Sequence, residues 1–394
     1  MTTIADRSTS RWIHPEDAHL SDLLEVLEQR TDLADYPHAA RSEQEVLVYD
    51  SAALREVIAT PQGRRDVQAE IAHALSEGPG IVVFTGAYAD RGVLDRTTDA
   101  FFAMIQAQRA SGVAAGDHFA KPGANDRIWN ALEKLAVEHP EVFVDYYAND
   151  IVALAATAWL GPSYQVTSQL NVVNPGGEGQ TVHRDYHLGF QSSEECGRYP
   201  AHVHALSATL TLQGAVAHVD MPVESGPTLY LPHSQKYAHG YVAYQQPQFQ
   251  EYFVANHVQL PLQAGDAVFF NPALFHAAGT NRTTDVKRMA NLLQISSAFG
   301  RAMETVDRER VVNAIYPALL AAQSAGRSAG ELANAIAASA EGYAFPTNLD
   351  RDQPIDGMSP RTQAEIVTEA LAVGMPADEL AHLLAANTDT RLSH

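Results

Sequence analysis

Apolar and polar positions follow different periods in successive parts of the chain. Apolar residues recur every three to four positions, the spacing of one helix face, in residues 64–75, 93–109, 127–135 and 142–160. Residues 80–86 instead form a β-branched run between two glycines, which predicts a short buried strand. Residues 1–160 are therefore expected to form a mostly helical region that packs on the rest of the protein.

The pattern changes after residue 160 to short runs of strand-forming residues between turns. The predicted strands are residues 164–174, 181–189, 204–213, 215–219, 228–232, 257–261, 267–271 and 289–298. Many short strands without long helices between them are typical of a sandwich or jelly roll. Helical spacing returns after residue 301. We therefore expect a β-core over residues 161–300 and a helical region over residues 301–394, whose apolar positions would also suit a homodimer.

Composition and charge narrow the class of protein. Apolar residues make up 46% of the 394 positions, without a run of eighteen that would predict a transmembrane helix. Cys196 is the single cysteine, so an intrachain disulfide and a cysteine-based zinc site are excluded. The formal net charge of −21 disfavours nucleic acid and anionic membranes as partners. These features predict a cytoplasmic protein that acts on a small molecule.

The strongest chemical signal is a histidine and a carboxylate two positions apart. His183 and Asp185 follow a Pro-Gly-Gly turn at residues 175–177, and residues i and i+2 of a strand point to the same face. Two histidines and one carboxylate are the ligand set of non-haem Fe(II) oxygenases. His276, at the end of an apolar run, is the best candidate for the second histidine. Arg288, twelve residues later, could pair with a carboxylate of a keto-diacid that chelates the iron.

Other roles for His183 and His187 stay open. His187 falls on the same face as His183 if the strand continues, so it could bind the metal or contact the substrate. A zinc site on a helix, with His183 and His187 one turn apart, is less favoured. That motif places a glutamate directly after the first histidine, and Arg184 stands there instead.

A loop ahead of the β-core also carries candidate chemistry. Residues 116–129 combine several polar and charged side chains with Trp129. Loops are frequent sites of binding, so His118, Lys121 and Arg127 are candidate substrate contacts. The alternative is a plain connecting loop that Trp129 anchors.

Four stretches of the chain together resemble one known family. They are residues 168–177 with His183-Arg-Asp185, residues 224–234, residues 265–276 and residues 281–296. In this order they resemble the strand signatures of the phytanoyl-CoA dioxygenase family of Fe(II)/2-oxoglutarate oxygenases, over roughly residues 78–300. His233 stands where the family commonly has glycine. Ala277 and Ala278 stand where a small hydroxyl often helps to bind the cosubstrate.

The resemblance implies a fold and a set of cofactors. The fold would be a double-stranded β-helix (a jelly-roll, cupin-like core) with helical additions at both ends. Fe(II) would be held by His183, Asp185 and His276, with 2-oxoglutarate and O2 as cosubstrates. The residues that bind the cosubstrate would be Arg288, Gln169 and Thr228. Lys287 would replace Arg288 if the strand register shifts by one residue.

The implied reaction is hydroxylation of a small metabolite, with succinate and CO2 as co-products. Desaturation, cyclisation and epimerisation use the same cofactors and are alternatives. Asp185 argues against a halogenase, in which a small residue replaces the carboxylate. A non-catalytic β-core binding protein is disfavoured by the intact ligand set. A zinc hydrolase on a cupin-like core would leave Arg288 without a role.

Overall fold

The computed structural model describes residues 11–111, 124–355 and 357–394. The chain divides into two compact units, each made of three segments. Unit 1 comprises Met1–Ala87, Gly116–Asp126 and Asn171–Leu292. Unit 2 comprises Tyr88–Ala115, Arg127–Leu170 and Leu293–His394.

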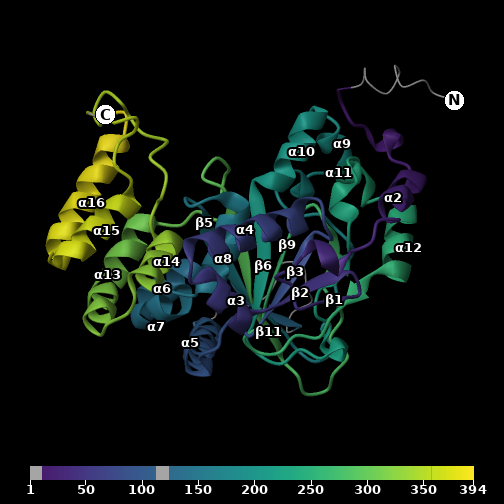
Figure 1. Ribbon diagram of the computed structural model, residues 1–394, viewed down its shortest axis with the longest axis horizontal. Coiled ribbons are helices and arrows are strands. Elements are labelled where there is room, and N and C mark those ends of the chain that lie inside the picture. Colours follow the sequence, from purple (N-terminus) through teal and green to yellow (C-terminus); the bar gives the residue numbers. More distant parts are fainter. Residues whose placement is uncertain (1–10, 112–123, 356) are drawn as a thin grey trace. The chain divides into compact units, whose positions relative to one another are not determined.

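Unit 1 contains residues of every strand of an eight-stranded sheet, whose strand order is β1-β2-β3-β9-β6-β11-β5-β4 (Figure 1). The strands are β1 (Arg41–Glu43), β2 (Val46–Asp50), β3 (Ile81–Thr85), β4 (Asn125–Ile128), β5 (Gln165–Val173), β6 (Thr211–Ala217), β9 (Ala267–Phe270) and β11 (Arg288–Ser296). Strand β3 pairs parallel with β2 and antiparallel with β9. The predicted strand at residues 80–86 is thus confirmed, and it lies inside the sheet rather than at its edge.

A second, three-stranded sheet has the order β10-β7-β8. Its strands are β7 (Leu229–Leu231), β8 (Val258–Gln259) and β10 (Phe275–Ala277). Strand β10 pairs antiparallel with β7, which places His276 opposite Tyr230. His276 also forms an isolated bridge with His183, through N–H to carbonyl bonds of 2.9 and 3.1 Å. This sheet therefore brings together two segments that are 93 residues apart in the sequence.

Helices and 3-10 turns complete unit 1. They include α2 (Leu20–Val26), α3 (Ser51–Ile58), α4 (Pro61–Ser76), η3 (His187–Phe190), α9 (Ser193–Cys196), α10 (Ala201–Thr209), η5 (Ser234–Lys236), α11 (Gly240–Ala243) and α12 (Pro247–Asn256). Helix α4 packs on β3 and helix α3 on β2. In one apolar cluster, Ile13 and Leu23 of the N-terminal segment lie with Val182 and Leu188, which flank His183. The N-terminal segment thereby buries the backbone that carries the candidate site.

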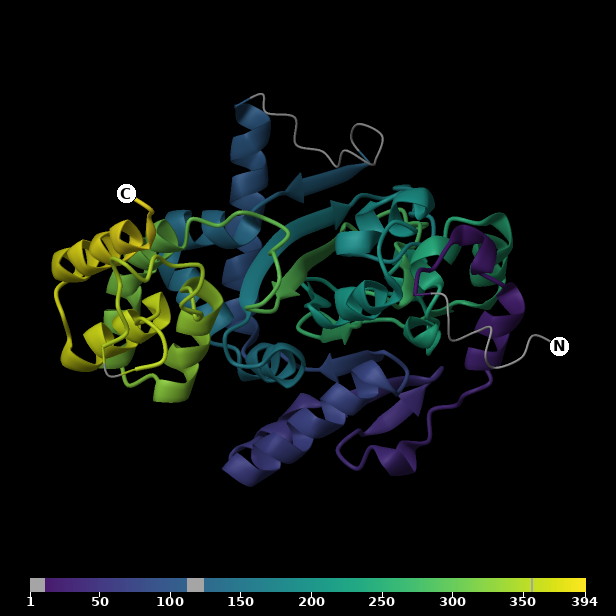
Figure 2. The same ribbon diagram turned by 90° about the horizontal axis from the view of Figure 1, so that it is seen from above.

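Unit 2 is mainly helical. Its helices are α5 (Arg91–Ala110), α6 (Ala131–Glu138), α7 (Pro140–Tyr147), α8 (Asp150–Leu160), α13 (Arg308–Ser324), α14 (Ala329–Ser339), α15 (Gln363–Val373) and α16 (Ala377–Arg391). Helix α13 packs against α6, α7, α14 and α16, and Figure 2 shows the green and yellow C-terminal helices gathered together. Capping boxes at Ser328 and Thr362 fix where α14 and α15 begin.

The expected sheet-rich core with helical additions is confirmed, and the sheets form no closed barrel in the described part of the chain. Two predicted strands are wrong. Residues 181–189 contribute only the His183 bridge, because Tyr186 and His187 have φ of 64° and 45° and turn the chain into η3. Residues 204–213 begin as α10, which buries His204 and Ser207 three positions apart, and the strand starts at Thr211. Among the described helices, none has the length and apolar character to span a bilayer.

Candidate metal and cosubstrate site

Three side chains of unit 1 converge where the His183 segment meets β10. The candidate ligand atoms of His183, Asp185 and His276 all lie within 4.8 Å of one another. Oδ2 of Asp185 is 3.5 Å from Nε2 of His276, and Oδ1 is 3.9 Å from Nε2 of His183. Within the described residues, this is the one group of three or more such side chains that could hold a metal ion.

The backbone fixes which nitrogen of each histidine faces the carboxylate. Nδ1 of His183 is 2.8 Å from the carbonyl of Thr181, and Nδ1 of His276 is 2.8 Å from the carbonyl of Leu274. A carbonyl only accepts hydrogen bonds, so each Nδ1 carries a proton and each Nε2 is the nitrogen that faces Asp185 and is available to a metal. Two imidazole Nε2 atoms and a carboxylate then face one another, and these are the donor atoms that a metal ion could bind.

The protonation states also suit a metal. Burial alone would raise the pKa of Asp185, but the charge interactions with His183 and His276 and hydrogen bonds from His276 and Gln213 hold it well below its usual range. Burial and the neighbouring His276 lower the pKa of His183. At neutral pH the carboxylate is therefore ionised and the imidazole neutral, which are the forms that bind metals.

Arg184 lies between two of the candidate ligands and anchors their segment. Its side chain is fully buried, and burial lowers the pKa of the guanidinium to about 10. Nη2 donates to the carbonyls of Ser234 (2.6 Å) and Tyr237 (3.0 Å), and Cζ lies 5.1 and 5.0 Å from the ring centroids of Tyr241 and Phe275. Gly240 leaves the space for this group, because a Cβ there would lie 1.8 Å from Cζ of Arg184.

Arg288 provides a second buried cation in unit 1. Nη1 donates to the carbonyls of Ser225 (3.1 Å) and Gly279 (2.9 Å). Burial lowers the pKa of Arg288 to about 10, so the group stays charged at neutral pH. In the described part of the chain, no carboxylate lies within ion-pairing distance of it. Lys287, the alternative cation, is exposed. Arg288 is thus a buried cation that could form an ion pair with an anionic ligand.

The other two predicted cosubstrate contacts lie in different units. Thr228 precedes β7, is partly buried and bonds the side chain of Tyr230, which in turn interacts with Arg288. Gln169 belongs to the part of β5 in unit 2. Its Oε1 accepts a hydrogen bond of 2.9 Å from Arg127.

The residues predicted to contact the substrate lie in different elements of the structure. Arg127, in β4 rather than in a loop, lies over the ring of Trp129 at 4.4 Å. His187 is not part of the metal-binding group, and its Nδ1 is 3.4 Å from Oγ of Ser207. His118 and Lys121 lie outside the described residues.

Sequence reasoning missed two residues that support this group, one through the backbone segment and one by direct contact. Arg184 could not be recognised, because its partners are 50 and 53 residues away. Gln213, which donates a hydrogen bond to Oδ2 of Asp185, could have been noticed in the sequence. It is a large polar residue within an otherwise apolar run, Leu-Gln-Gly-Ala-Val, and it is buried in β6.

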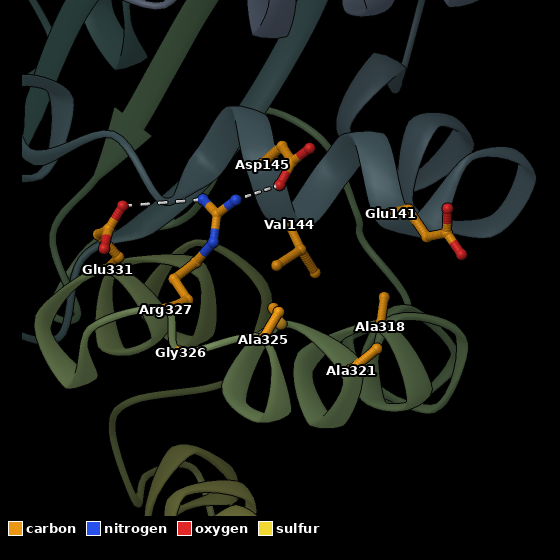
Figure 3. Close-up of a pocket in the computed structure, with 10 residues that line it drawn as sticks. Glu141, Val144, Asp145, Ala318, Ala321, Ala325, Gly326, Arg327 and Glu331 are labelled. Carbon is orange, nitrogen blue, oxygen red and sulfur yellow. Dashed lines mark hydrogen bonds and ion pairs between the residues drawn. The ribbon is translucent and has the colours of Figure 1, made fainter.

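Unit 2 contains a groove of about 500 Å³ (Figure 3). It is lined by Glu141, Val144, Asp145, Ala318, Ala321, Ala322, Ala325, Gly326, Arg327 and Glu331. Arg327 contacts Asp145 of α7 at 2.5 Å and Glu331, four residues later in the chain, at 3.8 Å. The groove is therefore lined largely by alanines and by an arginine that is already paired with carboxylates, and we assign no chemistry to it.

The sheet-rich core and the group of two histidines and one carboxylate define the class of non-haem Fe(II) oxygenases. Residues 76–290, more than half of the chain, match the family model described as phytanoyl-CoA dioxygenase (PhyH). The chain belongs to this family, whose members use Fe(II), 2-oxoglutarate and O2. The protein is accordingly a non-haem iron, 2-oxoglutarate-dependent enzyme.

Several solved structures are distantly similar. The α-ketoglutarate-dependent epimerase SnoN from nogalamycin biosynthesis is 19% identical (63% of this chain, 82% of that chain, TM-score 0.40). The carbocyclase SnoK from the same biosynthesis is 21% identical (58% and 83%, TM-score 0.42). HygX from Streptomyces hygroscopicus, with nickel, 2-oxoglutarate and hygromycin B bound, is 14% identical (60% and 90%, TM-score 0.41). No curated protein matches the chain. Likeness this distant does not define the substrate or the reaction.

Proposed function

We propose that this enzyme hydroxylates a small metabolite, with succinate and CO2 as co-products, and that His183, Asp185 and His276 hold its iron. The observation that carries the proposal is the convergence of two Nε2 atoms and one carboxylate, all within 4.8 Å of one another. The donor set fits Fe(II) and leaves coordination positions for other ligands.

The remaining assignments concern binding of the cosubstrate. When bound, Fe(II) with 2-oxoglutarate supplies the activation of O2. Arg288 would pair with the distal carboxylate of 2-oxoglutarate, since it is a buried cation without a carboxylate partner among the described residues. Thr228 would contribute to the cosubstrate site within unit 1. Asp185 keeps a carboxylate in the metal-binding group, and for this reason we propose hydroxylation rather than halogenation.

The substrate would be a small molecule. We propose that His187 contacts it, while the candidates His118 and Lys121 lie outside the described residues. His187 is supported by Nε2, which is buried and has no hydrogen-bond partner in the described part of the chain. A net charge of −21 makes a polyanionic substrate unfavourable.

A metabolite screen scored by succinate release tests the proposed reaction. Purified enzyme is incubated in air with Fe(II), 2-oxoglutarate and each candidate, and products are identified by mass. A gain of one oxygen atom supports hydroxylation. Loss of two hydrogens would indicate desaturation or cyclisation, and an unchanged mass would indicate epimerisation. The variant His276→Ala should release no succinate, whereas His202→Ala, which removes an exposed histidine of α10, should match the wild type.

A further inference from the structure

Gln213 occupies an unexpected position in the central sheet. It lies in β6, between β9 and β11, opposite Phe270 of β9, and only 4% of it is exposed. Its side-chain Nε2 donates a hydrogen bond to Oδ2 of Asp185. Strand β6 therefore reaches the candidate metal-binding group through one polar side chain.

Chemistry fixes the orientation of this amide. An ionised carboxylate only accepts hydrogen bonds, so the NH2 end of Gln213 must face Asp185. The other end, Oε1, is then buried, and it has no hydrogen-bond partner in the described part of the chain. An unsatisfied buried acceptor costs about 1–3 kcal/mol. An apolar side chain of similar size would avoid this cost, so packing alone does not account for a glutamine here.

The hydrogen bond constrains the carboxylate of Asp185. Rotation of a carboxylate about its last side-chain bond is only weakly restricted by intrinsic torsion. With iron bound, the Nε2 atoms of both histidines would face the ion, and among the described residues Gln213 would then be the one side-chain donor to the carboxylate. Removal of that donor would free the carboxylate to rotate, and would leave two acceptors, Oδ1 and Oδ2, without a fixed orientation.

We propose that Gln213 is a positioning residue of the iron site, whose amide N–H holds the Asp185 carboxylate in its metal-binding orientation. This inference rests on the proposed function, because it requires that Asp185 is an iron ligand. Partners of metal ligands commonly change metal affinity about 10–100-fold when they are substituted. Gln213 would act through Asp185 without touching the metal.

Two substitutions and a matched control test the proposal. Gln213→Leu removes the donor, and Gln213→Glu keeps the shape but replaces the donor with an acceptor. The control is Gln235→Leu in the same unit. Gln235 is also buried, donates from Nε2 to the carbonyl of Gly78 at 2.9 Å and has a buried, unpaired Oε1. Fe(II) affinity is measured anaerobically by competition with a chromophoric chelator, and folding by thermal denaturation.

Both Gln213 variants should bind Fe(II) about 10–100-fold more weakly than the wild type, with Gln213→Glu the weaker of the two. Gln235→Leu should lose thermal stability but keep its Fe(II) affinity. Unchanged affinity in Gln213→Glu would overturn the inference, as would a loss in all three variants that follows their loss of stability. Failure of the wild type to bind Fe(II) would instead refute the proposed function, so the two failures can be told apart.

Discussion

Substitution of Gly240 by alanine tests how the metal-binding segment is held. A methyl group at this position would lie 1.8 Å from Cζ of Arg184 and 2.1 Å from both terminal nitrogens. Gly240 opens α11 and is not among the glycines with positive φ, so its backbone conformation can accept alanine. The whole effect of Gly240→Ala should therefore come from displacement of the Arg184 guanidinium.

The size of the effect follows from the contacts of Arg184. A displaced guanidinium loses hydrogen bonds to the carbonyls of Ser234 and Tyr237. Hydrogen bonds to charged groups contribute about 1.5–3 kcal/mol each, and a disrupted buried charge costs about 3–5 kcal/mol in all. We expect Gly240→Ala to lower the free energy of unfolding by roughly 3–5 kcal/mol, a large part of the roughly 5–15 kcal/mol typical of a folded protein.

The assay is urea denaturation followed by circular dichroism, with Fe(II) affinity measured on the same samples. Gly330→Ala is the control, because a Cβ at this α14 position meets nothing within 4 Å, and it should be neutral or stabilise by up to about 1 kcal/mol. The double variant Arg184→Met/Gly240→Ala should recover part of the loss, since the clash is gone. A loss below about 1 kcal/mol for Gly240→Ala, or strict additivity in the double variant, would refute this account of the anchor.

Two further variants probe the cosubstrate anchor and the core. Arg288→Met should raise the 2-oxoglutarate concentration for half-maximal turnover at least about 30-fold while Fe(II) affinity is kept, because loss of one partner of a buried charge pair costs about 2–5 kcal/mol. An unchanged requirement would contradict the anchoring role. Burial lowers the pKa of His218 to about 3, so the unfolded chain takes up the proton first as the pH falls through about 6.5. Between about pH 6.5 and 5, the free energy of unfolding of the wild type should fall by roughly 1.5 kcal/mol more than that of His218→Gln. Equal losses for the two proteins in urea titrations would show that His218 does not stay neutral in the folded protein.

The sequence was sufficient to predict that His183, Asp185 and His276 lie together, but not the backbone that brings them there. His183 and Asp185 do lie on one side of their segment, as an extended conformation requires, and His276 lies in the predicted strand. The segment itself makes only a single bridge. Tyr186 and His187 both have positive φ although neither is a glycine. The residue types therefore did not indicate the turn that places His187 outside the candidate metal-binding group.

The support around the group was less predictable. The carbonyls that bind Arg184 come from backbone around η5, which any residue type could supply. Gln213 is different, because a glutamine within a buried strand is unusual enough to be noticed in the sequence. Its partner could still not be assigned, since register relative to β9 and β11 depends on the whole sheet.

An anaerobic titration with Fe(II) in the presence of 2-oxoglutarate tests the central claim most directly. If the iron is held by His183, Asp185 and His276 and chelated by 2-oxoglutarate, the wild type should develop a weak visible charge-transfer band that saturates at one iron per chain. The band should be absent from Asp185→Ala and retained in His202→Ala. A wild-type protein without the band, or an Asp185→Ala variant that keeps it at full intensity, would contradict the assignment.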